Sequence, residues 1–191
     1  MLTTTQARIQ PVAIQTLLPN VTREQAIQTF SAGAASLYWK MRSGTLHRMA
    51  DAYIPFRIYR VRYPLGRVLR THLFAMDAVD GSLDPFEFAA LPGEAEIVSV
   101  CTRNHLAPAL SEIRGEELLR DKVLRIIFQR GFFKLRTVNL ATERLPAEIH
   151  LPYWLGFYGP PANLRFRVMD AVRRRIEGAK VSMLFEEWFA A

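Results

Sequence analysis

The chain carries Tyr53-Ile54-Pro55-Phe56 in its first half and the related segment Leu151-Pro152-Tyr153-Trp154 in its second. Each segment is followed by the same four residue types, at Met76-Asp77-Ala78-Val79 and at Met169-Asp170-Ala171-Val172. The offset between the two halves is 97 residues at the prolines and 93 at the Met-Asp-Ala-Val segments. We interpret this as a duplicated unit whose copies differ mainly by four residues in one connection.

The elements expected around these segments follow the same order in both halves. Thr22 and Gln25 form a capping box, which predicts the start of a first helix. Apolar residues at helical spacing predict a second helix over 116–130 and a third over 181–188. Branched and aromatic residues predict strands over 37–41, 53–63, 68–76, 132–140, 148–158 and 164–168. The unit is therefore a helix followed by three strands.

This order predicts an α+β fold, in which a tandem duplication builds one antiparallel sheet around a pseudo-twofold axis, with the helices packed on one face. We expect an N-terminal arm over 1–21 and a single domain over 22–191. The domain divides into a first repeat (22–88), a connection (89–114) and a second repeat (115–191). One continuous sheet is favoured over two domains because three strands and one helix bury little apolar surface alone. Chance similarity of short segments is the alternative.

Composition and charge limit the classes of partner and compartment. Lys and Arg outnumber Asp and Glu by 25 to 18, and the formal charge of +7 favours anionic partners. The single cysteine, Cys101, excludes an intrachain disulfide, and we expect it to be a buried thiol in a strand. The sequence shows no signal peptide and no run of about 20 apolar residues. We predict a cytoplasmic protein, with a position at the inner face of the membrane as a further option.

Motifs for metal, nucleotide or nucleophile chemistry are absent. The chain has no glycine-rich phosphate loop and no cysteine pair, and its histidines are widely spaced, at His47, His72, His105 and His150. We therefore predict no metal, no cofactor and no catalytic site. The one pair that invites an enzymatic hypothesis is Asp77 with Asp170, because two carboxylates in one pocket divide acid and base roles. The alternative is that each caps its own turn.

Basic residues alternate along three predicted strands and so share faces within each strand. If those strands are neighbours, one sheet face carries Arg60, Arg62, Lys134, Arg136, Arg165 and Arg167, with Arg173, Arg174 and Arg175 beyond the last strand. Guanidinium groups suit phosphate and carboxylate ligands, so these residues are predicted to bind an anionic partner. The alternative is a charged face that only keeps the sheet solvated.

The segment from Leu151 to Pro161 is too apolar for a strand with one wet face. Tyr and Trp are favoured at protein contacts. We therefore predict a docking patch made of Tyr153, Trp154, Phe157 and Tyr158. Burial beneath the last helix is the alternative.

These features favour a non-enzymatic basic binding protein, an accessory or peripheral subunit of a larger assembly. Its partner would be an acidic protein surface or the cytoplasmic face of a membrane complex. A second hypothesis is nucleic-acid binding through the cationic sheet face, with an affinity that falls steeply with salt. A third is an enzyme that uses Asp77 and Asp170.

Overall fold

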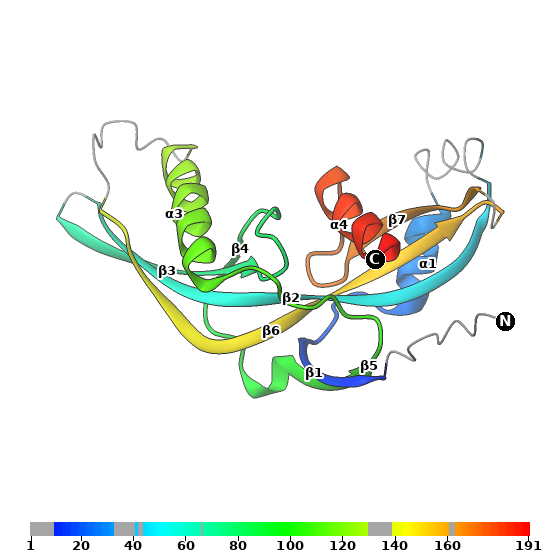
Figure 1. Cartoon of the computed structure of the whole chain (residues 1–191), viewed down its shortest axis with the longest axis horizontal. Helices are drawn as coiled ribbons and strands as arrows, with labels where there is room; N and C mark the ends of the chain where they lie inside the picture. The colour runs from blue at the N-terminus through cyan, green and yellow to red at the C-terminus, as the bar shows by residue number, and fades with distance from the viewer. Residues whose placement is uncertain (1–9, 33–40, 42–43, 66, 130–138, 161–162) are drawn as a thin grey trace, which may run out of the picture.

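The computed structural model describes residues 10–32, 41, 44–65, 67–129, 139–160 and 163–191. In this part of the chain the fold is mixed α+β, with three α-helices and a curled sheet of eight strands (Figure 1). The helices are α1 (Arg23–Ser31), α3 (Glu112–Gln129) and α4 (Ala179–Ala190). The strands are β1 (Val12–Leu17), β2 (Leu46–Leu65), β3 (Val68–Asp77), β4 (Phe86–Phe88), β5 (Ile97–Thr102), β6 (Ala141–Tyr158), β7 (Arg165–Asp170) and β8 (Arg175–Ile176), and a 3-10 turn, η1 (Glu94–Glu96), precedes β5.

Two long antiparallel strands, β2 and β6, run through the middle of the sheet. In their register, Tyr53 lies opposite Pro152 and Pro55 lies opposite His150. On the outer side of β2 lie β3 and β4, and β7 lies beside β6 with β8 next to it. The pair β1 and β5 joins through a parallel contact of β1 with β6. Figure 1 shows α3 at one end of the long strands and both α1 and α4 at the other.

Pro55 and Pro152 lie inside these central strands, where a proline normally removes a hydrogen bond from the ladder. The backbone of Pro55 faces away from β6, because its carbonyl accepts from Ala78 N at 2.8 Å. In the same way the carbonyl of Pro152 faces away from β2 and accepts from Ala171 N at 3.1 Å. The ladder between β2 and β6 therefore loses no donor at either proline.

The helices cover both faces of the sheet. The helix α3 packs on the face of β2 that carries Tyr59, and α1 packs on the same face, around Met49 and Tyr158. The helix α4 packs through Phe185 against Leu155, which points to the opposite face because side chains of β6 alternate. The prediction that all helices lie on one face is therefore wrong. A helical pattern shows which side of a helix is buried, but not which face of a sheet it covers.

The first predicted helix and several strands are confirmed. The capping box at the start of α1 is formed, with Gln25 N donating to Thr22 Oγ1 at 3.3 Å and Thr22 N donating to Gln25 Oε1 at 3.0 Å. Gly81 adopts the left-handed conformation, with φ of 74°. This glycine lies in the loop between β3 and β4.

Other expectations need correction. Residues 12–17, which belong to the predicted arm, form β1, because all six pair with β5. Cys101 is exposed, although it lies in β5 as expected, because its side chain points to the solvent face of that outer strand. Most of the strand predicted over 132–140 and most of the one over 37–41 lie outside the described residues. Within the described residues, no helix is both long enough and apolar enough to cross a bilayer.

Candidate functional site

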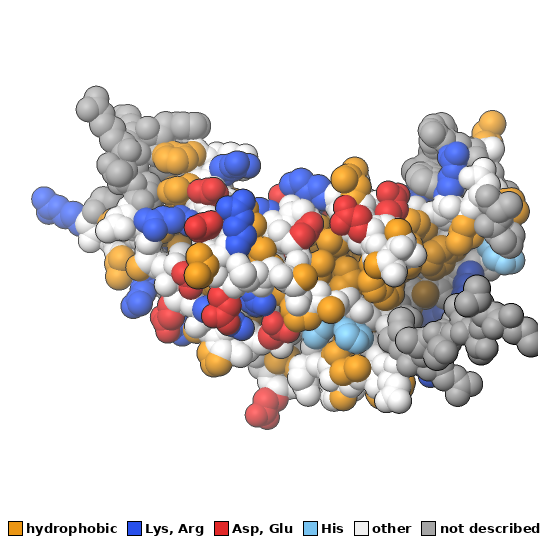
Figure 2. Space-filling view, viewed as in Figure 1, with side chains coloured by type: hydrophobic (Ala, Val, Ile, Leu, Met, Phe, Trp, Pro, Cys, Tyr) orange, Lys and Arg blue, Asp and Glu red, His pale blue; other side chains and the backbone are white. Residues whose placement is uncertain are grey.

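A hollow of about 390 Å³ lies between α4 and the edge of β2. We call it the α4 groove and define it by His47, Arg48, Ala50, Asp51, Asn104, Leu155, Phe157, Leu164, Trp188 and Phe189. Figure 2 shows hydrophobic side chains gathered over this half of the molecule, whereas charged side chains gather over the half that carries α3. The groove thus opens in the more apolar part of the visible surface.

Aromatic rings form one wall of the α4 groove. The ring of Phe189 lies 5.3 Å from the rings of both Trp188 and Phe166, and 6.0 Å from that of Phe157. Although it belongs to this cluster, Phe189 is 47% exposed. It follows the buried Phe185 by four residues on the same helical side, so it extends the apolar stripe of α4 past the covered part of the sheet. Exposed rings in a preformed cluster are typical anchors for a partner.

Four polar residues, His47, Arg48, Asp51 and Asn104, also line the groove. The carboxylate of Asp51 accepts hydrogen bonds from Tyr53 Oη at 3.0 Å and from Asn104 Nδ2 at 3.3 Å. Burial raises the pKa of Tyr53, and the neighbouring Asp51 carboxylate raises it further, so the phenol keeps its proton and remains a donor. His47 and Arg48 are exposed on the rim. The groove therefore combines an apolar wall with a few fixed polar groups, as binding sites commonly do.

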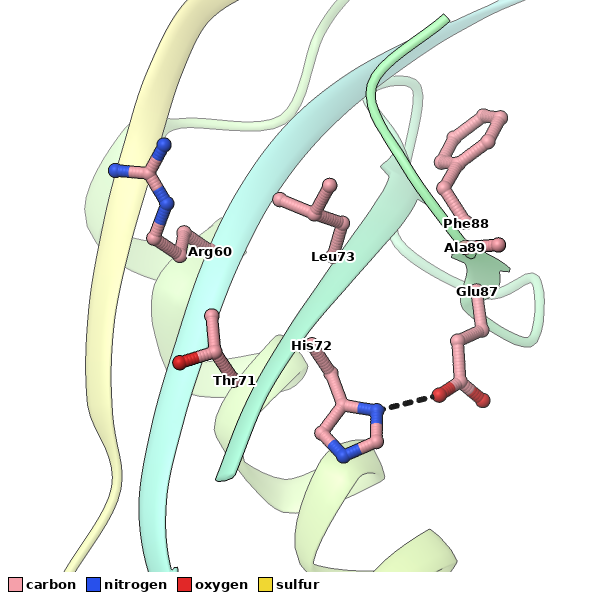
Figure 3. Close-up of a pocket in the computed structure, with 7 residues that line it drawn as sticks. All are labelled: Arg60, Thr71, His72, Leu73, Glu87, Phe88 and Ala89. Atoms are coloured by element: carbon pink, nitrogen blue, oxygen red, sulfur yellow. Dashed lines mark hydrogen bonds and ion pairs between the residues drawn. The ribbon is translucent and has the colours of Figure 1, made fainter. Parts of the chain in front are cut away.

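A second hollow, of about 520 Å³, lies beside β3 and β4 (Figure 3). His72 Nδ1 lies 2.7 Å from Glu87 Oε1, and His72 Nε2 lies 3.2 Å from Tyr63 Oη. A carboxylate that orients an imidazole toward a hydroxyl is the arrangement by which a base activates a nucleophile. Tyr63, however, is only 4% exposed and stacks on the His72 ring. Because no substrate reaches this phenol, we interpret the chain of contacts as a bond between strands.

The predicted pair of aspartates is kept apart by the topology. The strands β3 and β7, which end at Asp77 and Asp170, are separated by β2 and β6. Asp77 accepts from three backbone N–H groups of its own turn, and Asp170 accepts from two backbone N–H groups and from Arg173 Nε at 2.5 Å. Each carboxylate is therefore a turn cap, and the two do not share a pocket.

The predicted cationic face is divided between the two sides of the sheet. Arg60 and Arg62 lie in β2 on the α4 side, where both approach Glu143, at 3.0 Å and 3.6 Å. Arg165 and Arg167 lie in β7 on the α1 side, since they pair with alternate residues of β6 that face α1. Lys134 and Arg136 lie outside the described residues. Arg173 and Arg174 lie in the turn after β7 and Arg175 begins β8; Arg173 and Arg175 form ion pairs.

The predicted docking patch lies mostly inside the protein. Tyr153 and Tyr158 are 1% and 2% exposed, because α4 covers the first and α1 covers the second. Trp154 is half-buried and donates from Nε1 to Val21 O at 2.9 Å. Phe157 lines a surface hollow, the α4 groove. The interior thus accounts for most of the apolar excess of this segment.

Sequence reasoning missed Asp51, Asn104, Leu164 and Phe189 as members of a site. The amphipathic pattern of the last helix contained a signal for Phe189, since this ring follows Phe185 by four residues. Within the described residues, no group of three or more His, Cys, Asp or Glu side chains is arranged to hold a metal ion. In comparisons with known proteins, no protein-family model matches the chain, and no curated protein and no solved structure matches it.

Proposed function

We propose that the protein is a non-enzymatic binding protein, an accessory subunit that docks on a partner protein through the α4 groove. The observation that carries the proposal is the aromatic wall, in which Phe189 is 47% exposed although it lies against four other rings. A partner that covers this apolar surface removes it from water, and this burial stabilises the complex.

The charge of the chain adds an expectation about the partner. The formal charge is +7, and Arg48 and His47 are exposed on the rim of the groove. The guanidinium of Arg48 beside an apolar centre suits a partner with a carboxylate next to an apolar anchor. The partner is therefore an acidic protein surface, in the cytoplasm or on the cytoplasmic face of a membrane complex. The split arginines and the turn-bound aspartates give less support to nucleic-acid binding and to an enzymatic function.

We also propose that the two halves arose by tandem duplication and are related by a pseudo-twofold axis. The register between the long strands supports this, because a shift of 97 residues exchanges the pair Pro55 and His150 with the pair Pro152 and Tyr53. The outer strands support it too, since Asp77 and Asp170 end their strands at equivalent places in the two halves.

Affinity capture from the source cell tests the proposed function. We expect wild-type protein to retain a defined partner that Phe189→Asp loses, since a carboxylate in the aromatic wall opposes its burial. The matched control is Leu91→Asp, which places the same charge at another exposed apolar side chain, outside the groove. Equal retention of the partner by both variants would refute docking at the α4 groove.

A further inference from the structure

We propose that the partner binds the α4 groove as an extended segment, which adds a strand to the edge of β2 between Leu46 and Ala52. This inference rests on the proposed function and specifies its mode. An exposed sheet edge binds a peptide through main-chain hydrogen bonds, while pockets for alternate side chains supply specificity.

The backbone direction at this edge follows from the residues just beyond it. Tyr53 N donates to Asn104 O at 2.8 Å, and Tyr53 O accepts from Leu106 N at 2.9 Å, so the polar backbone groups of Tyr53 point away from β6. Backbone direction repeats every second residue along a strand. The N–H and C=O groups of Asp51 and Met49 therefore point to the same edge.

Within the described residues, only part of this edge of β2 is paired with another segment of the chain. From Phe56 onward the edge pairs with β3, and at Tyr53 it forms a single parallel bridge to His105. Among the described residues, no strand pairs with the edge between Leu46 and Ala52. A row of backbone donors and acceptors without a strand partner is a template for an added strand.

The groove lies beside this row of backbone groups. The side chains of Arg48 and Ala50 point to the α4 side, because they lie opposite Phe157 and Leu155 in the register. Every second side chain of an added strand would point to that side as well and would enter the α4 groove. We therefore expect apolar or aromatic residues at alternate positions of the partner segment, with a nearby carboxylate that pairs with Arg48.

A phage-displayed library of random 12-residue peptides tests this mode without knowledge of the partner. Peptides that bind the full chain are synthesised, and their Kd is measured by fluorescence anisotropy after N-methylation of each residue in turn. We expect Kd to rise at least tenfold for methylation at every second residue and to change less than threefold at the residues between. A uniform response along the peptide, or the absence of any enriched peptide, would overturn strand addition.

Substitutions at Asp51 test the protein side. Proline at this position removes the N–H that faces the edge and leaves the ladder with β6 intact, whereas alanine removes the same carboxylate and keeps the N–H. We expect Asp51→Pro to raise Kd at least tenfold over Asp51→Ala, with equal circular dichroism spectra. Equal Kd values for the two variants contradict strand addition. The docking function would still stand in that case, provided that Phe189→Asp abolishes binding. If Phe189→Asp binds as wild type, the proposed function fails as well.

The same edge could instead pair with the edge of a second copy of this chain. Analytical ultracentrifugation distinguishes a partner segment from a second copy of the chain as the group that pairs with this edge. We expect a monomer at the concentrations used for peptide binding, and a dimer that Asp51→Pro dissociates would overturn the assignment to a partner segment.

Discussion

Gly156 allows α1 to lie close to β6. A Cβ atom at this position would lie 2.9 Å from Phe30 Cδ2 and 3.1 Å from Leu46 Cδ1. Because Phe30 is fully buried, we expect Gly156→Ala to lower the free energy of unfolding by about 1–3 kcal/mol. Urea denaturation measures this change. The control is Gly178→Ala, where a Cβ meets no atom within 4 Å and the expected cost is limited to the weaker N-cap preference of alanine. A loss of the same size at Gly178 would contradict the packing explanation.

His150 makes the stability of the fold depend on pH. The imidazole is 9% exposed, lies 3.3 Å from Gln15 O and stands near His105 and Glu148. Burial lowers the pKa of His150 below its ordinary value of 6.5, an effect that the carbonyl of Gln15 and the carboxylate of Glu148 oppose and His105 adds to. The unfolded chain therefore takes up the proton first as the pH falls.

We thus expect the free energy of unfolding to decrease as the pH is lowered through 6.5 toward the pKa of the folded state. Urea denaturation at pH 7.5 and pH 5.5 measures the difference. His150→Gln should reduce this difference, whereas His47→Gln, at an exposed position, should leave it as in the wild type. An unchanged difference in His150→Gln would rule out this histidine as the source.

Single residues were predictable where the cause is local. The turn-capping alternative for Asp77 and the capping box at Thr22 depend only on neighbours within a few positions. The positions of Arg60 and Arg167 on opposite faces of the sheet could not be predicted from the sequence. Alternation fixes which residues of one strand share a face, but only the register between strands shows whether two such faces coincide.

At the scale of elements, the start of α1 depends on the side chain of Thr22. Its Oγ1 accepts from Gln25 N, which otherwise has no partner within the helix. We expect Thr22→Ala to lower the free energy of unfolding by about 1 kcal/mol. Thermal and urea denaturation check this value. Thr29→Ala is the control, because Thr29 lies inside the same helix and donates only to the carbonyl of Gln25. If the two variants lose equal stability, the Thr22 cap makes no specific contribution to the free energy of unfolding.

The strands β2 and β6 are longer than their amino-acid composition predicts. The sequence favours strands from residues 53 and 148, whereas β2 begins at Leu46 and β6 begins at Ala141. The added residues, such as Asp51 and Glu143, have low strand propensity. They are extended because each strand supplies hydrogen-bond partners to the other along almost its whole length. Three of the four polar residues that line the α4 groove, His47, Arg48 and Asp51, belong to this added part, so strand propensity could not reveal them.

At the scale of the molecule, the two halves depend on the pairing of β2 with β6. This pairing spans both strands and places Ile54 opposite Leu151 in the core. The sequence predicted that the halves fold against each other in one sheet. It did not predict that β1 would join this sheet, because β1 is short and obtains its stability from distant partners.

The dependence of the halves on each other can be tested with the fragments 1–111 and 112–191. Without β6, the first fragment exposes Ile54 and Phe56, and without β2 the second exposes Leu151, all of which are at most 1% exposed in the whole chain. Uncovering this apolar surface removes the main stabilising term of each half. We expect each fragment alone to lack a cooperative thermal transition by circular dichroism, and an equimolar mixture to recover one. A cooperative transition in 1–111 alone would show that the first half is an independent domain, and the pairing of β2 with β6 would then be an interface between domains rather than the centre of one fold.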